Sequence, residues 1–102
     1  MVVHAGIIPG IFVEAMDPYD LLHMRNIEGR LQPHESDAFG EPWVNRWQGP
    51  FHVVFGHDSN RGLQRTSFAT GLDTGCVYGL ELTALIMPEN EIISVQSTQP
   101  RW

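Results

Sequence analysis

Two histidines in this sequence each follow a short apolar run and lie close to a glycine. His4 follows Val2 and Val3 and leads into a glycine turn, and His57 follows Gly56 at the end of the apolar run at residues 51–55. Neutral imidazole binds divalent metals, and neighbouring strands that end at one sheet edge bring such side chains together. We therefore predict that His4 and His57 end adjacent strands with their rings close together. The alternative is that both are ordinary surface or hydrogen-bonded histidines.

Weaker candidates for binding a substrate lie elsewhere. Two glycines surround Asp73 in the segment 71–76, which predicts a tight loop that returns to the same sheet edge. Arg46 lies next to a tryptophan and is able to bind an anion. The spacing of Trp43 and Trp47 favours a packing role for both, on one face of a short helix.

The first half of the chain must position His4. Asp17 and Pro18 are typical of a helix N-terminus, and we expect a helix over residues 17–26. Its apolar stripe comprises Leu21, Leu22, Met24 and Ile27, which leaves His23 and Arg25 solvated. Residues 28–40 show no apolar periodicity and are expected to form a surface loop.

The second half is rich in strand patterns. The run 51–55 has the length and residue types of a buried strand, and Gly56 is expected to make the sharp turn that aims His57 outward. Residues 63–69 predict another strand, and residues 80–87 and 91–96 predict an antiparallel hairpin around a proline turn. The chain therefore reads as one domain of mixed helices and strands.

Length, charge and composition exclude several classes of function. The 102 residues carry a net charge of -6, and all six basic residues are arginines, so binding of nucleic acid or of a membrane surface is not expected. No apolar run approaches the roughly 20 residues of a membrane span. One cysteine, Cys76, allows no disulfide within the chain, and we expect a cytoplasmic protein.

Taken together, the motifs resemble those of the calcineurin-like metallophosphoesterases. The sequence is similar to the carboxyl half of the symmetrical dinucleoside tetraphosphatase-like branch, near the serine/threonine phosphoprotein phosphatases. The motifs that carry this resemblance are VHAG at residues 3–6, MR at 24–25, VFGHD at 54–58, GLDTGCVYG at 71–79 and LTAL at 82–85. The resemblance implies an α/β fold, α+β in this portion, that forms the distal half of a β-sandwich flanked by helices and ends in an antiparallel hairpin.

The resemblance also implies a metal site. In the family, the histidines that match His4 and His57 bind one metal of a dinuclear centre, which contains manganese, zinc, iron or magnesium. The family's loop that matches residues 71–79 borders the cleft, which makes Tyr78 a candidate for binding the substrate; the alternative is that Tyr78 caps the sheet. Many relatives have a second histidine two positions later, where this sequence has Ser59. The family's upstream motifs, Asp-x-His, Gly-Asp-x-x-Asp-Arg and Gly-Asn-His, do not occur here. The chain thus contains no catalytic residue of the family. We therefore expect phosphoesterase activity to require the amino half of the domain as well.

Three hypotheses follow. The first is a phosphoesterase that hydrolyses phosphate esters or anhydrides in a phosphorylated small molecule or phosphoprotein, and that is inactive without the amino half. The second is a non-catalytic remnant that interacts through the sheet surface left uncovered. The third is a small metal-binding or scaffolding module.

Overall fold

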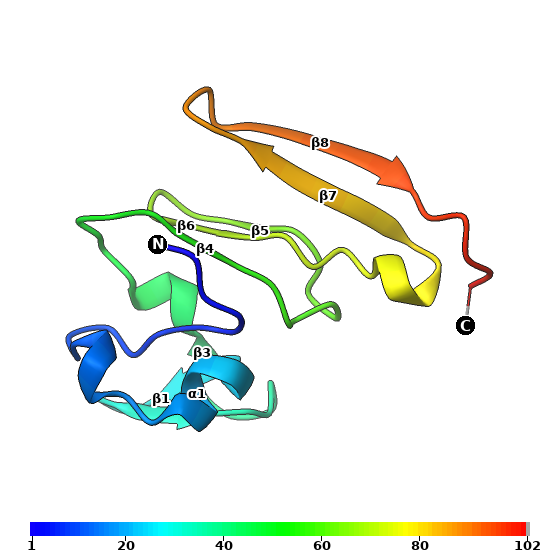
Figure 1. The fold of residues 1–102 in the computed structure, drawn as a ribbon. Coiled ribbons are helices and arrows are strands. Elements are labelled where there is room, and N and C mark those ends of the chain that lie inside the picture. Colours follow the sequence, from blue (N-terminus) through cyan, green and yellow to red (C-terminus); the bar gives the residue numbers. More distant parts are fainter. Residues whose placement is uncertain (102) are drawn as a thin grey trace.

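A three-stranded sheet forms the centre of the computed structural model, which describes residues 1–101. Strand β4 (Val53–Phe55) pairs in parallel with β6 (Ala69–Gly71), and β6 pairs antiparallel with β5 (Gln64–Arg65) (Figure 1). The expected single strand at 63–69 is wrong, because the chain turns between β5 and β6, where the Thr66 amide donates to the Ala69 carbonyl at 2.9 Å.

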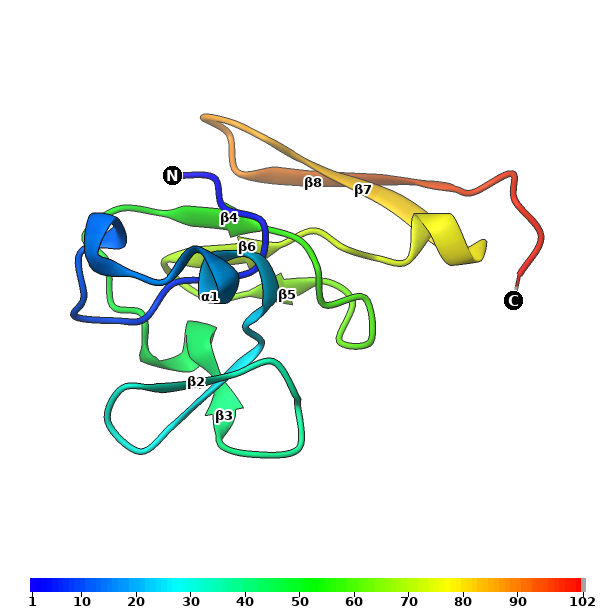
Figure 2. The same cartoon turned by 60° about the horizontal axis from the view of Figure 1, so that its bottom comes forward.

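A second, smaller sheet lies on one side of the central sheet, together with helix α1 (Pro18–His23) (Figures 1 and 2). Its strands are all antiparallel, in the order β2 (Gln32–His34), β1 (Asn26–Glu28) and β3 (Glu41–Pro42). The prediction of a surface loop over residues 28–40 is therefore wrong in part. The pairing of β1 with β2 rests on backbone hydrogen bonds and not on an apolar pattern. The side chains in this segment therefore did not predict the strands.

Helix α1 begins as predicted and ends earlier. The Asp17 side chain accepts a hydrogen bond from the Tyr19 amide at 2.9 Å, which caps the helix next to Pro18. The helix ends at His23 because Met24 takes an extended conformation and the chain enters β1.

The apolar core lies between the amino-terminal segment, α1 and the two sheets. At its centre, Trp43 is only 1% exposed, packs on the Phe55 ring at 4.9 Å, and donates its indole N–H to the Ala5 carbonyl at 3.2 Å. A Cβ at Gly6 would lie 2.4 Å from the indole nitrogen, so only glycine fits beneath this ring. The short 3₁₀ helix η2 (Trp43–Arg46) thus places Trp43 in the predicted packing role. The buried apolar residues are Ala5, Ile7, Ile8, Met16, Met24, Ile27, Trp43, Val44, Val53, Phe55 and Ala69.

An antiparallel hairpin completes the fold on the opposite side of the central sheet. Strands β7 (Glu81–Ile86) and β8 (Glu91–Gln96) pair antiparallel, as predicted for residues 80–87 and 91–96, and follow the 3₁₀ helix η3 (Cys76–Tyr78) (Figure 1). The α+β class with a terminal hairpin is confirmed. No helix within residues 1–101 has the length and apolar character needed to cross a membrane.

Candidate functional site

His4 is positioned by the edge of the central sheet. Val2 forms a parallel bridge with Val54, the Val3 amide donates to the Val54 carbonyl at 3.0 Å, and the Gly56 amide donates to the His4 carbonyl at 2.9 Å. The amino-terminal segment therefore runs beside β4, and both segments end in a histidine. The ring centroids of His4 and His57 are 5.1 Å apart, which confirms the predicted proximity.

His57 takes an unusual backbone conformation at the end of β4. Its φ of 70° lies in the left-handed region, which is uncommon for residues other than glycine and costs about 1 kcal/mol or more. The sharp turn was expected at Gly56, but the φ angle of Gly56 does not lie in the left-handed region. The left-handed conformation is found one residue later, at His57. Backbone conformations of this kind cluster at functional sites.

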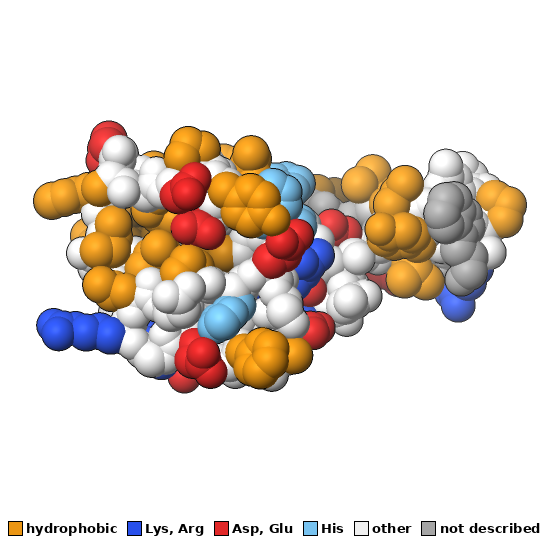
Figure 3. Space-filling model, turned by 90° about the horizontal axis from the view of Figure 1, so that it is seen from below, with side chains coloured by type: hydrophobic (Ala, Val, Ile, Leu, Met, Phe, Trp, Pro, Cys, Tyr) orange, Lys and Arg blue, Asp and Glu red, His pale blue; other side chains and the backbone are white. Residues whose placement is uncertain are grey.

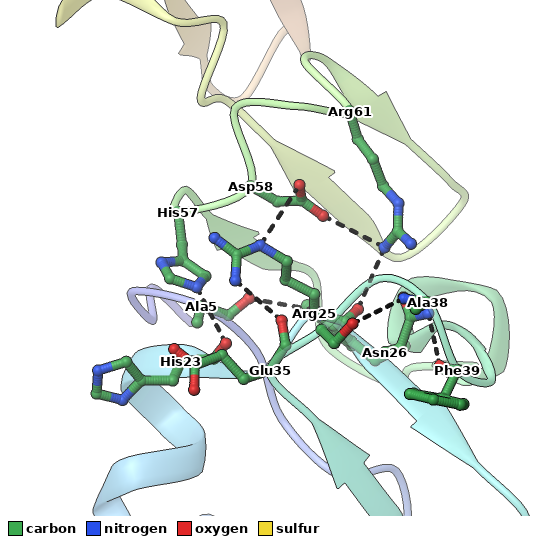
Figure 4. Close-up of polar contacts among 12 residues, drawn as sticks. Ala5, His23, Arg25, Asn26, Glu35, Ala38, Phe39, His57, Asp58 and Arg61 are labelled. Atoms are coloured by element: carbon green, nitrogen blue, oxygen red, sulfur yellow. Dashed lines mark hydrogen bonds and ion pairs between the residues drawn. The ribbon is translucent and has the colours of Figure 1, made fainter.

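The hydrogen bond of His57 determines which of its nitrogens is free. Nε2 lies 3.0 Å from the His23 carbonyl oxygen at the end of α1 (Figure 4). A carbonyl only accepts, so Nε2 carries the proton in the neutral ring and Nδ1 keeps an unshared electron pair. Helix α1 therefore fixes the tautomer in which Nδ1 is available as a metal ligand.

The surroundings of His57 favour its neutral form. Burial lowers the pKa of His57 below its usual range, and the positive charge of Arg25 lowers this pKa further. The hydrogen bond to the His23 carbonyl acts in the opposite direction, and His4 and His23 have smaller lowering effects. An imidazole that remains neutral at pH 7 is ready to bind a metal without first losing a proton.

A cluster of two arginines and one carboxylate lies next to His57. The sequence pattern did not predict this cluster. Asp58 is buried, with 4% of its side chain exposed, and forms ion pairs with Arg61 at 3.2 Å and with Arg25 at 3.7 Å (Figure 4). Neither Asp58 oxygen accepts a hydrogen bond of good geometry, so the two guanidinium groups are the partners of this buried carboxylate. Arg25, predicted to be solvated, is instead part of this cluster.

A cleft of about 380 Å³ opens beside the histidine. Figure 3 shows histidine and charged side chains gathered where the molecule narrows toward its carboxyl-terminal segment. Tyr78 lines the same cleft as His57, as the loop prediction implied. The residues around the cleft are Arg25, His57, Ser59, Asn60, Tyr78 and Leu80.

Two other sequence candidates have different surroundings. Arg46 is not among the cleft residues: its guanidinium pairs with Glu41 at 3.6 Å and donates to the Gly29 carbonyl. The Asp73 carboxylate accepts a hydrogen bond from the Gly75 amide at 3.2 Å and so stabilises its own loop. The structure thus joins Tyr78 with His57 and places neither of these other side chains around the cleft.

The donor set fits part of a metal site. His4 and His57 offer two imidazoles, one of them with a defined free nitrogen. Within residues 1–101, no group of three or more His, Cys, Asp or Glu side chains is arranged to hold a metal ion. A catalytic metal needs about three protein ligands, which is more than these two histidines supply.

Comparison with known proteins finds similar sequences and a similar solved structure. The chain is 36% identical over 75 residues to the bis(5'-nucleosyl)-tetraphosphatase PrpE [asymmetrical] of Halalkalibacterium halodurans, and 40% identical over 75 residues to that of Anoxybacillus flavithermus. A crystal structure of a candidate diadenosine tetraphosphatase matches with a TM-score of 0.88 at 42% sequence identity. The chain is thus similar to proteins that are named as dinucleoside tetraphosphatases. No protein-family model matches the sequence.

The match covers most of this chain and a minor part of the other proteins. It covers 74% of this chain and 30% of each of the two relatives, and 95% of this chain and 46% of the solved one. The chain thus spans less than half the length of each of these proteins. The resemblance was to the symmetrical branch, whereas these two relatives are named as asymmetrical enzymes.

Proposed function

We propose that this chain supplies two metal-ligating histidines, His4 and His57, to a phosphoesterase that hydrolyses phosphoanhydrides of the dinucleoside polyphosphate class. The observation that carries the proposal is the 5.1 Å separation of the two rings, with the Nε2 proton of His57 committed to a carbonyl. The names of the relatives and of the solved protein support a dinucleoside tetraphosphate over a phosphoprotein as the substrate.

When bound, a pair of divalent ions such as manganese, zinc, iron or magnesium clamps phosphate oxygens and lowers the pKa of a water molecule. The role of this chain is to hold two imidazoles in a fixed geometry. Helix α1 orients His57 through its last carbonyl, and the pairing beside β4 orients His4. The remaining ligands and the general acid come from the amino half of the domain, so the chain alone is inactive.

Metal binding by the isolated chain tests the ligand assignment. We expect weak binding of manganese and zinc, because two imidazoles form an incomplete ligand set. His4→Ala or His57→Ala should abolish this binding in a titration followed by NMR of the imidazole resonances. His34→Ala is the matched control, because His34 lies on β2 and bonds to Glu28 at 3.0 Å. Binding that persists in both His4→Ala and His57→Ala would show that the ligands have been wrongly chosen.

Activity tests the need for the amino half. The isolated chain should show no turnover of diadenosine tetraphosphate or of an aryl phosphate with manganese present. Co-expression with the amino half of the Anoxybacillus flavithermus relative should restore hydrolysis, and His57→Ala should remove it again. Turnover by the isolated chain that disappears in both histidine variants would refute the requirement for a second half.

A non-catalytic role is the second candidate, and one observation favours it. The hairpin exposes apolar side chains that include Leu82 and Val95, which is the surface expected of a protein that acts by association. Restored hydrolysis in the co-expression experiment would exclude it.

A further inference from the structure

Two stacked rings of helix α1, those of Tyr19 and His23, form an aromatic platform beside the histidine pair. Their centroids are 4.0 Å apart and their planes differ by 20°. The His23 ring also lies 6.2 Å from the His57 ring, with the two planes at 87°. Within residues 1–101, Tyr19 makes no ring contact with His57, so Tyr19 is the outer member of the platform. The His23 ring points away from the cluster of Arg25 and Asp58 (Figure 4).

Both rings of the platform are held in place without a ligand. Nδ1 of His23 lies 2.8 Å from the Tyr19 carbonyl oxygen, so in the neutral ring Nδ1 carries the proton and donates it. The Tyr19 hydroxyl donates to the Glu35 carboxylate at 2.6 Å, and the Tyr19 amide donates to the Asp17 side chain at 2.9 Å. The platform therefore loses little conformational freedom when a ligand binds to it.

The outer face of the platform is open to a ligand. Tyr19 is 52% exposed although the His23 ring covers one face of its ring, so the exposed area is mainly the opposite face and the ring edge. A single exposed aromatic residue is ordinary. A ring that is stacked from behind, hydrogen-bonded at its tip and next to a candidate metal ligand is a surface on which another aromatic ring can stack.

The charges around Tyr19 favour an uncharged ligand. The hydrogen bond to Glu35 raises the pKa of the Tyr19 hydroxyl above its ordinary value of 10.0, and the negative charges of Glu35 and Asp20 raise this pKa further. The Tyr19 ring is therefore neutral at pH 7, and the two carboxylates repel phosphate groups. The surface suits a planar, neutral base, and it does not suit the phosphate chain to which that base is joined.

We propose that the outer face of the Tyr19 ring stacks on a purine base of a dinucleoside polyphosphate whose phosphate chain lies at the histidine pair. This inference rests on the proposed function and adds a nucleobase site to it. Tyr19 lies one ring beyond His23 from His57, an offset that suits a base separated from its phosphate by a ribose. A purine offers a larger face for stacking than a pyrimidine. Inorganic polyphosphate and phosphoproteins carry no base, so Tyr19 favours nucleotides over both.

Binding of adenosine monophosphate to the complete 102-residue chain, with EDTA present, tests the platform independently of any metal. The ring resonances of Tyr19 should shift upfield on titration at millimolar concentration. Ribose 5-phosphate, which has the same sugar and phosphate without the base, should leave them in place. Tyr19→Ala should weaken binding of adenosine monophosphate by about tenfold, and Tyr19→Phe, which keeps the ring, by less than about threefold. Phe39→Ala is the matched control, because Phe39 is a 58% exposed ring that contacts His34 instead.

The outcomes separate this inference from the proposal on which it rests. Tyr19 resonances that stay in place at saturating adenosine monophosphate overturn the inference, and this measurement does not depend on whether a variant folds. Equal binding by wild type and a folded Tyr19→Ala variant overturns it as well. Ribose 5-phosphate that shifts Tyr19 as far as adenosine monophosphate does excludes a base at this ring, and uridine monophosphate that binds as tightly overturns the preference for a purine. A shift of Tyr19 by adenosine monophosphate, together with metal binding that survives both His4→Ala and His57→Ala, would support the nucleobase site and count against the proposed function alone.

Discussion

The body of the molecule, residues 1–79, buries many of its apolar side chains. The terminal hairpin, β7 and β8, leaves most of its apolar side chains exposed. In the body, Trp43, Ile27 and Val53 are at most 1% exposed, and they pack between two sheets and α1. On the hairpin, the cross-strand partners Leu82 and Val95 are 58% and 62% exposed. A two-stranded ribbon has no second layer of its own, so its apolar face stays in solvent unless another element covers it. The comparison teaches that the body has a core of its own, whereas no element within residues 1–101 covers the apolar face of the hairpin.

The largest expected effect is a loss of stability when a side chain in the core of the body is truncated. Trp43→Ala should lower the free energy of unfolding by about 3–5 kcal/mol, because it leaves a cavity next to Gly6 and removes the contact with Phe55. Denaturant unfolding followed by circular dichroism measures the loss. Trp47→Ala is the control and should cost about half as much, because Trp47 is only partly buried. Equal losses would mean that the core does not centre on Trp43.

An intermediate effect is expected on the hairpin, in association and not in stability. Leu82→Ser combined with Val95→Ser should reduce self-association and binding of a hydrophobic dye, because it removes the exposed apolar pair. The free energy of unfolding should change by no more than about 1 kcal/mol. Leu63→Ser, which removes one exposed leucine from the body, is the control and should leave dye binding nearly unchanged. A large loss of stability in the double variant would show that the hairpin packs on the body after all.

The smallest expected effect concerns a hydrogen bond at the surface of the body. The Tyr19 hydroxyl donates to the Glu35 carboxylate at 2.6 Å and holds the pKa of Glu35 below its ordinary value of 4.5. Tyr19→Phe should therefore raise the pKa of Glu35 toward 4.5, which an NMR titration of the carboxyl carbon measures. Tyr78→Phe is the control, and an unchanged pKa in Tyr19→Phe would contradict the assignment.

The sign of the pH dependence follows from the lowered pKa. The folded chain binds the Glu35 proton less readily than the unfolded chain, so this bond stabilises the fold above pH 4.5. The contribution is lost as the pH falls through the lowered pKa of the folded state. The difference in stability between wild type and Tyr19→Phe should therefore shrink in acid.

Local patterns in the sequence determined several features of this protein. The glycine and histidine that follow apolar runs predicted that His4 and His57 meet, since strands that end at one sheet edge bring their last residues together. The cap at Asp17 and the alternation in residues 80–96 likewise predicted the start of α1 and the hairpin. Each of these features depends on neighbours within a few residues, or on one repeated pattern.

Tertiary structure decided the rest. Arg25 reaches Asp58, and His57 reaches the carbonyl of His23, only because α1 and β1 dock against the end of β4. These partners lie more than 30 residues apart in the sequence, and a charged side chain in a polar stretch gives no periodic signal of its partner. The sequence likewise made the alternating face of β7 apolar but could not determine whether it is buried, since burial requires a second surface to pack against.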